Sequence, residues 1–266
     1  PSSTLPWLGR DYALQFIKPR EGGYYEEEFA AAMGSGADVF AIVVSAAQFS
    51  NGTRPPLKAL ADLAHRHGAL LIANVTQATG LMPLSLLKDG VDFAAGTGHK
   101  WLMSGFGNGF IAAPKASRER FTLPGMGWLS VEDPMAMENR VALPMERAAR
   151  VEYGTMGLLP RVCLAESIRA LEIEGMERNF AYVRGLSKAL RAGAKERGIS
   201  ILGAEDPARQ GATVLLKIDG SEALVEDLAK RGIVVSHRRG GIRLSPHLYN
   251  TPGDITAFFE VLDSLR

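Results

Sequence analysis

The sequence predicts an α/β protein with a mainly parallel sheet sandwiched by helices, followed by a smaller C-terminal α+β domain. In the first half of the chain, short apolar runs alternate with amphipathic helical stretches, which is typical of βαβ units and a parallel sheet. In the last third, the order becomes strand, helix, strand, strand, helix, which favours a small α+β unit. We therefore expect a large domain over 1–157, and a linking helix with the small domain over 158–266.

The predicted sheet comes from the first half. Residues 38–45 (DVFAIVVS) form a continuous, largely β-branched run, as expected of a strand covered on both faces. Further strands are predicted over 12–18, 69–73, 91–95 and 109–113, with helices over 25–33, 57–67 and 84–88.

The second half has a different texture. Residues 116–155 are rich in Met, Pro and Gly and are predicted to be irregular. Helices are then predicted over 158–174, 179–197, 221–231 and 254–265, and strands over 213–218, 233–236 and 241–244. Ser221 is the expected N-cap of its helix, because a serine hydroxyl can accept a hydrogen bond from the first turn.

Composition narrows the possible functions. A net charge of +1 over 266 residues gives no indication of nucleic acid or another polyanionic partner. No apolar run reaches the length needed to cross a membrane, so no membrane association is expected. The single cysteine, Cys163, allows no disulfide or cysteine zinc site within one chain, and the scattered histidines predict no metal site. We expect a cytoplasmic enzyme.

Polar residues follow three of the predicted strands. Ligands of open α/β sheets bind at the carboxyl ends of the strands, so these residues are site candidates. They are Gln48, Asn51 and Gly52 after the first strand, Asn74 and Gln77 after the second, and Thr97, His99 and Lys100 after the third. A lysine beside a buried strand is a candidate nucleophile, because desolvation favours the neutral amine, which forms Schiff bases with aldehydes. On spacing alone, the favoured interpretation is a strand end followed by a solvated lysine, with Asn and Gln that cap helices and turns.

Four motifs sharpen this interpretation. They are NVTQ (74–77), GHKWL (98–102), EYGT (152–155) and IRLSPHLYNT (242–251). In this order and spacing they resemble the class V aminotransferase family of fold-type I pyridoxal-phosphate enzymes. The resemblance covers almost the whole chain, and the family includes cysteine desulfurases, selenocysteine lyases, isopenicillin N epimerase-like proteins and kynureninase relatives.

The resemblance implies a pyridoxal 5′-phosphate enzyme acting on an amino acid by aminotransferase, lyase or epimerase chemistry. Lys100 matches the lysine that forms the internal aldimine and moves the α-proton. His99 and Thr97 match residues that bind the cofactor phosphate, Gln77 matches the residue beside the pyridine O3′, and Asn74 lies at the position that faces the pyridine nitrogen.

The resemblance also implies substrate and partner contacts. Arg243 matches the arginine that pairs with the substrate α-carboxylate, although by pattern alone it is a strand-surface charge. Gln48 is expected on the substrate side. Thr155 matches a threonine that reaches the phosphate of the partner subunit's cofactor, so a homodimer is expected. His247 and Asn250 are expected to shape the turn after the last strand.

Two features depart from the family pattern, and a third argues against one subclass of the family. Asn74 stands where the family has an aspartate that keeps the pyridine nitrogen protonated, which predicts a weaker electron sink. The chain starts after the expected position of the phosphate-binding turn and of the residue that stacks on the ring. Cys163 is expected to pack within the apolar face of its helix, which argues against persulfide transfer.

Two alternatives remain open at this point. The neutral Asn74 and the absent phosphate-binding turn favour an inactive or truncated homologue with a structural or binding role. A nucleotide-binding protein unrelated to pyridoxal phosphate is less well supported, because no glycine-rich phosphate motif follows a strand. The glycine-rich stretch 105–109 precedes a strand and is expected to form a turn.

Overall fold

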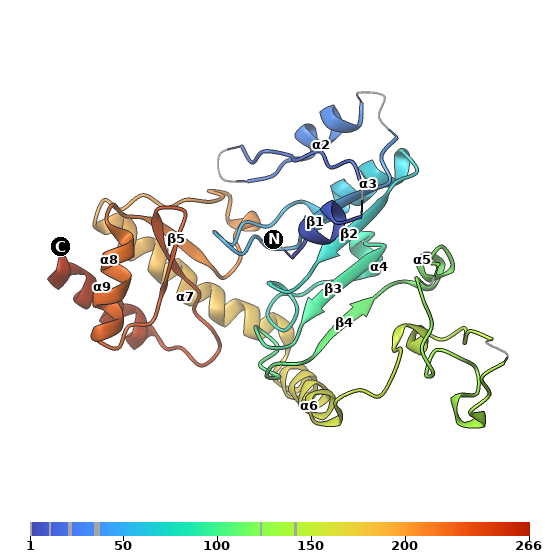
Figure 1. The fold of residues 1–266 in the computed structure, drawn as a ribbon. Helices are drawn as coiled ribbons and strands as arrows, with labels where there is room; N and C mark the ends of the chain where they lie inside the picture. The colour runs from blue at the N-terminus through green and yellow to red at the C-terminus, as the bar shows by residue number, and fades with distance from the viewer. Residues whose placement is uncertain (1, 11, 21–22, 35–37, 123, 141–142) are drawn as a thin grey trace.

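The computed structural model describes residues 2–10, 12–20, 23–34, 38–122, 124–140 and 143–266. Its larger sheet has the order β1-β2-β3-β4, formed by Ala41–Ser45, Leu70–Asn74, Phe93–Thr97 and Gly109–Ala112. The first three strands are parallel and β4 is antiparallel to β3, so the predicted mainly parallel sheet is confirmed (Figure 1).

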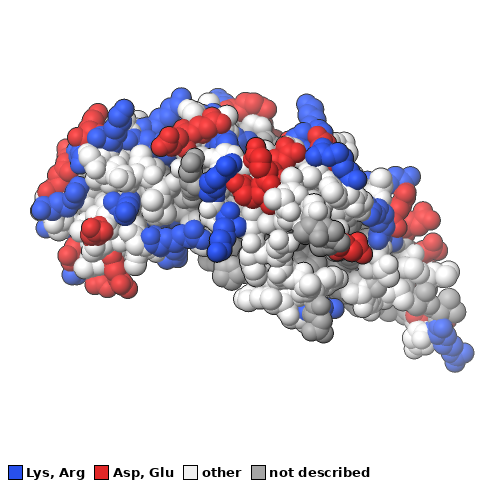
Figure 2. All heavy atoms as spheres, turned by 90° about the horizontal axis from the view of Figure 1, so that it is seen from above, with Lys and Arg blue, Asp and Glu red and all other residues white. Residues whose placement is uncertain are grey.

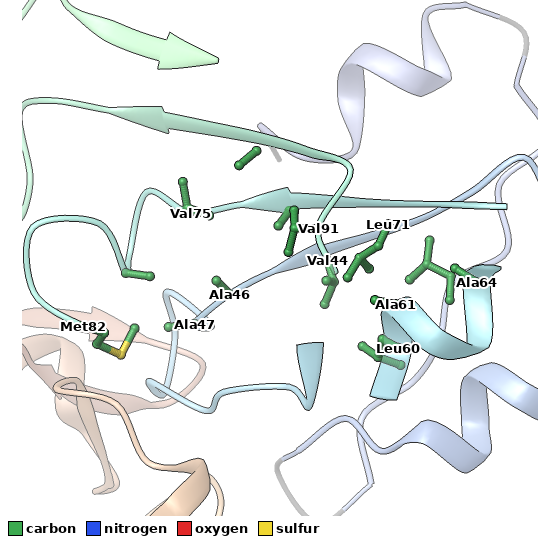
Figure 3. Packing of buried hydrophobic residues seen from close by; sticks show 14 of the residues in the cluster. Val44, Ala46, Ala47, Leu60, Ala61, Ala64, Leu71, Val75, Met82 and Val91 are labelled. Atoms are coloured by element: carbon green, nitrogen blue, oxygen red, sulfur yellow. The ribbon is translucent and has the colours of Figure 1, made fainter. Parts of the chain in front are cut away.

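Helices flank this sheet. Their bounds are α1 Leu5–Leu8, α2 Glu26–Met33, α3 Leu57–Arg66, α4 Leu86–Asp89 and α5 Lys115–Glu119, with 3-10 turns at Pro134–Ala136 and Ala148–Val151. In α3 the apolar residues recur on one side, and that side is buried against the sheet. Figure 3 shows Leu60 and Ala61 of α3 lying against Val44 and Leu71 of the strands. Burying a leucine in this way stabilises the fold by about 1.5–3 kcal/mol.

A second unit follows the irregular segment. It contains α6 Leu158–Glu174, α7 Met176–Glu196, a 3-10 turn Pro207–Arg209, β5 Val214–Lys217, α8 Ser221–Lys230, β6 Ser236–Arg238, β7 Gly241–Leu244 and α9 Pro252–Leu265. The strands form an antiparallel sheet of order β5-β7-β6 with its own core. Helix α7 joins the two cores, because Phe180 and Val183 belong to the first, and Leu186 and Leu190 to the second (Figure 1).

Several local predictions were wrong. Residues 12–18 are irregular and not a strand, since the segment makes no ladder with any described strand. The N-cap of α8 is Gly220 at φ +69°, because the chain enters that helix through a left-handed turn, and Ser221 is its buried first residue. The predicted strand 233–236 lies instead at 236–238. Alternating burial in β1 shows that only one face of this strand is fully buried.

The described surface carries no strong charge bias. Figure 2 shows basic and acidic side chains interspersed over the upper face, in keeping with the net charge of +1. Among the described residues, no helix is both long enough and apolar enough to cross a membrane.

Candidate active site

The carboxyl ends of β1, β2 and β3 meet at one edge of the sheet. Ser45 pairs with Asn74, and Asn74 pairs with Ala95. The hydrogen bonds continue past the strand ends, because the amide of Val75 donates to the carbonyl of Ala95 at 2.9 Å. The strand end at Asn74 and the loops that carry Gln48 and Lys100 therefore lie side by side, at the edge where such sheets bind ligands.

Asn74 has a fixed side-chain orientation. Its Nδ2 donates to Oγ of Ser3 at 2.9 Å, and its Oδ1 accepts from the amide of Thr76 at 3.0 Å. Both contacts use the amide as a neutral donor and acceptor. An aspartate would lack the donor that Asn74 gives to Ser3.

The lysine lies in a tight loop that directly follows β3. The amide of Ser104 donates to the carbonyl of Gly98 at 2.9 Å, and the amide of Met103 donates to the carbonyl of Lys100 at 2.9 Å. A side chain at residue 98 would overlap Ser104 and Asn108, so only glycine fits. The positive φ values of Gly105 and Gly107 confirm the predicted turn before β4.

An aromatic stack holds the residue after the lysine. The rings of Trp101 and His247 lie 4.9 Å apart and nearly parallel, and the ring of His247 lies 4.6 Å from that of Tyr249. Trp101 Nε1 also donates to Oε1 of Gln77 at 3.0 Å. Trp101 and His247 are buried, and burial lowers the pKa of His247, so its ring is neutral near pH 7. The stack links the lysine loop, the loop after β2 and the C-terminal unit.

The predicted turn at His247 and Asn250 is confirmed. The amide of His247 donates to Oδ1 of Asn250 at 2.9 Å, and the amide of Asn250 donates to the carbonyl of His247 at 3.0 Å. The sequence interpretation missed the stack itself. A tryptophan directly after the lysine and a histidine between apolar residues near the chain end were the available signals.

The charge of Arg243 acts on Lys100. Desolvation by the surrounding protein, and then the positive charge of Arg243, lower the pKa of Lys100. Burial and the charge of Arg238 lower the pKa of Arg243 in turn. Arg243 Nη1 donates to the carbonyl of Phe49 at 3.1 Å, which places it beside the loop of Gln48. The structure thus brings Lys100, Arg243 and the Gln48 loop together.

Among the described residues, five buried side-chain polar atoms have no hydrogen-bond partner. Two of them, Oγ1 of Thr97 and Nε of Arg243, lie beside the lysine loop, and a third, Nε2 of His247, lies in the aromatic stack. Buried donors of this kind normally have a partner, so they mark positions that suit an anionic ligand group. Their presence next to the lysine loop fits a ligand that carries a phosphate or a carboxylate.

Two predicted site residues lie apart from this cluster. His99 is exposed and stacks on Phe106 at 5.2 Å, so its contact with a cofactor phosphate stays a prediction. Thr155 is exposed in the segment that extends away from the sheet between β4 and α6 (Figure 1). Its contact with a partner subunit likewise stays a prediction.

The expectation that Cys163 is buried in the apolar face of its helix was wrong. Cys163 lies on α6 as predicted, but its thiol is exposed. The helix places its apolar side on the surface, and only Leu171 of α6 is buried. Burial therefore gives no ground for excluding sulfur chemistry, although Cys163 lies within a helix and not on a loop.

We predict that Arg243→Gln raises the pKa of Lys100, because it removes a positive neighbour. The lysine pKa in the folded protein lies below its unfolded value, so folding stability rises with pH between the two values, and the variant reduces that rise. NMR titration of the reductively methylated lysine measures the shift. Arg239→Gln is the control, and an equal shift in both variants would contradict the prediction.

The fold is that of fold-type I pyridoxal-phosphate enzymes. The apo structure of a cysteine desulfurase from Thermococcus onnurineus NA1 superposes with a TM-score of 0.86 at 23% identity, covering 99% of this chain and 70% of that chain. A C-DES mutant with glycine covalently linked to its PLP cofactor gives a TM-score of 0.79 at 19% identity, covering 89% and 63%.

Sequence comparison names the family. The aminotransferase class-V model matches residues 3–258, so the chain belongs to this family, as the motifs predicted. A kynureninase from Monosiga brevicollis is 29% identical over 279 residues, which cover 98% of this chain and 60% of the kynureninase. The family binds pyridoxal phosphate, so the cofactor expectation is confirmed at the level of the family.

Proposed function

We propose that this chain is the lysine-bearing part of a pyridoxal-phosphate enzyme that acts on an amino acid. The observation that carries the proposal is the position of Lys100 in the loop directly after β3, with a lowered pKa and next to Arg243. Aminotransferase, lyase and epimerase chemistry all begin at such a lysine.

Each residue has a role that its surroundings support. When bound, pyridoxal phosphate draws electrons from the substrate's Cα. Nζ of Lys100, whose pKa is lowered, is the atom that accepts and returns a proton. Arg243 binds the substrate carboxylate through its guanidinium fork. The unpartnered hydroxyl of Thr97 donates to an anionic group of the cofactor, with His99 as a second candidate.

Gln77 and Trp101 orient the lysine loop. The hydrogen bond between them and the stack on His247 hold the interior side of this loop in place. The neutral His247 adds no second positive charge there. Gln48 stays a candidate on the substrate side, because the neighbouring carbonyl of Phe49 accepts from Arg243.

The direct test titrates the protein with pyridoxal phosphate and records absorbance. A visible band that changes when single amino acids are added supports the proposal. Failure to bind the cofactor under any condition contradicts it. Binding without conversion of any of the amino acids supports the second candidate, an inactive homologue with a binding role. The neutral side chain of Asn74, tied to Ser3, is the observation that favours this candidate.

We predict that Asn74→Asp strengthens the cofactor as an electron sink, because a carboxylate holds a proton on the pyridine nitrogen. The expected result is a shifted absorbance band and a single-turnover rate raised by about tenfold or more, equivalent to about 1.4 kcal/mol. Ser3→Ala is the control, because it removes only the contact to Nδ2. Unchanged absorbance and rate in Asn74→Asp would show that residue 74 does not face the nitrogen.

We also propose a homodimer that uses the apolar side of α6. Leu158, Leu159 and Ile173 on this helix are 75%, 73% and 78% exposed. On the preceding loop and β4, Phe106 and Ile111 are 84% and 67% exposed. Apolar surface on this scale is typical of protein interfaces. Such a dimer would cover Cys163, and Thr155 would belong to the segment that reaches the partner's cofactor. A cytoplasmic location remains part of the proposal.

We predict that Leu159→Asp converts a dimer into a monomer, because the change puts a charge into an apolar interface. Sedimentation velocity at several concentrations measures it. Leu87→Asp, at a residue on α4 that is 79% exposed, is the matched control and should leave the oligomeric state unchanged. A wild-type protein that is monomeric at high concentration contradicts the dimer.

A further inference from the structure

Two arginines share one face of the C-terminal hairpin. In the β6–β7 ladder, Ser236 pairs with Arg243 and Arg238 pairs with Gly241. Side chains alternate along each strand, so Arg238 and Arg243 project from the same face as diagonal neighbours, about 7–8 Å apart. Nothing stands between them on β7, because the residue opposite Arg238 is a glycine.

The hairpin turn fixes this arrangement. Its two central residues are Arg239 and Gly240, with φ values of +49° and +69°. Positive φ at both central positions is the pattern of the two-residue turn that matches the twist of a hairpin. A slip of one residue would move Arg238 to the opposite face, so the turn determines which arginine lies beside Arg243.

Lys100, Arg243 and Arg238 form a row of positive charge. Arg243 acts electrostatically on Lys100, and Arg238 acts on Arg243. Within the described part of the chain, no carboxylate forms an ion pair with any of the three. Unbalanced like charges destabilise a fold, and such a row attracts an anionic ligand. One carboxylate at Arg243 leaves the charge of Arg238 unmatched.

We propose that Arg238 recognises a second carboxylate, so that the substrate is an amino acid with an acidic side chain. Arg243 then binds the α-carboxylate and Arg238 the side-chain carboxylate, while the amino group is directed toward Lys100. This inference rests on the proposed function. It adds the substrate class, which the family resemblance leaves open. Arg238 is exposed at the hairpin end, and its Nη1 donates to the carbonyl of His237 at 2.6 Å. The Nε and Nη2 side of the guanidinium remains to bind a carboxylate in the two-pronged manner typical of arginine.

The test compares amino acids of equal shape with and without the second charge. Binding of L-aspartate and L-asparagine, and of L-glutamate and L-glutamine, is measured by calorimetry on protein loaded with pyridoxal phosphate. We expect the wild type to bind one acid more tightly than its amide. Arg238→Gln should weaken binding of that acid by about 10–100-fold, as expected for loss of a charged hydrogen bond, and leave the amide unchanged. Arg238→Lys should restore part of the loss.

Two control variants separate the explanations. Arg239→Gln removes a neighbouring charge from the turn and should change neither acid nor amide binding. Arg243→Gln should weaken binding of both members of each pair, because both carry the α-carboxylate. Equal affinity for acid and amide in the wild type, or an equal loss of both in Arg238→Gln, overturns the inference.

A final measurement keeps this inference distinct from the proposed function. If the protein binds pyridoxal phosphate but shows no preference for acids, only the substrate class is wrong. If it binds no pyridoxal phosphate, calorimetry with succinate on the protein alone still tests the arginine pair. Succinate binding that is lost in Arg238→Gln then supports the pair as a dicarboxylate site, and absence of succinate binding overturns it.

Discussion

Lys100→Ala is expected to remove the covalent attachment of pyridoxal phosphate and to lower turnover by at least about 10²–10⁴-fold, the usual contribution of a positioned acid–base group. This loss is expected because Lys100 is the proposed nucleophile and proton carrier. Lys100 lies in the loop directly after β3 with its side chain exposed, and partial desolvation and the charge of Arg243 lower the pKa of its amine, which favours the neutral, nucleophilic form. Alanine supplies neither a nucleophile nor a proton carrier.

Borohydride reduction followed by peptide mass spectrometry measures this effect. The wild type should carry reduced cofactor on the peptide that contains Lys100, and the variant should carry none. Lys88→Ala is the matched control, since Lys88 is an exposed lysine in α4. Labelling of another lysine in the wild type, or unchanged turnover in Lys100→Ala, would refute the assignment.

Gly80→Ala should lower the free energy of unfolding by about 2–4 kcal/mol. Gly80 has φ +92°, and a Cβ there would lie 2.7 Å from the carbonyl oxygen of Trp101. The substitution thus combines backbone strain with a clash against the main chain of the lysine loop. The loop after β2 approaches Trp101 this closely only because residue 80 has no side chain.

Gly68→Ala separates the effect of backbone strain from the effect of the clash with the lysine loop. Gly68 also has positive φ, at +70°, but a Cβ there meets nothing within 4 Å. Gly68→Ala should therefore lower the free energy of unfolding by only about 1–2 kcal/mol, through backbone strain alone. Urea unfolding of both variants gives the comparison. Equal losses would show that the contact between Gly80 and Trp101 is not tight.

The parallel part of the sheet could be predicted because each of its strands is a short apolar run followed by a polar strand end. The long helix over 158–174 was predicted with its observed bounds, since Gly157 and Gly175 flank it. The position of β6 could not be predicted from apolar content. Ile233 and Val235 are apolar because they pack against the second core, whereas the Arg239–Gly240 turn places the ladder at the more polar 236–238.

The candidate site was predictable to the extent that its residues follow strands. Asn74 and Thr97 end β2 and β3, and Lys100 follows in the next loop. Contacts between segments that are far apart in the sequence could not be predicted, because no local sequence pattern indicates them. Nothing near Asn74 in the sequence indicates Ser3, and nothing near Trp101 indicates His247. Cys163 was misplaced for a related reason, because an apolar helix face looks the same whether it packs inside the chain or lies on its surface.

The stack of Trp101 on His247 also gives the molecule an internal optical probe. A buried indole emits at shorter wavelength than a solvated one, and a ring in contact with it alters the intensity of that emission. Trp7 and Trp128 lie in other segments, so replacing both with phenylalanine leaves Trp101 as the sole tryptophan. The emission spectrum of Trp101 then shows whether His247 of the C-terminal unit stays in contact with the lysine loop when ligands bind or when the protein is heated.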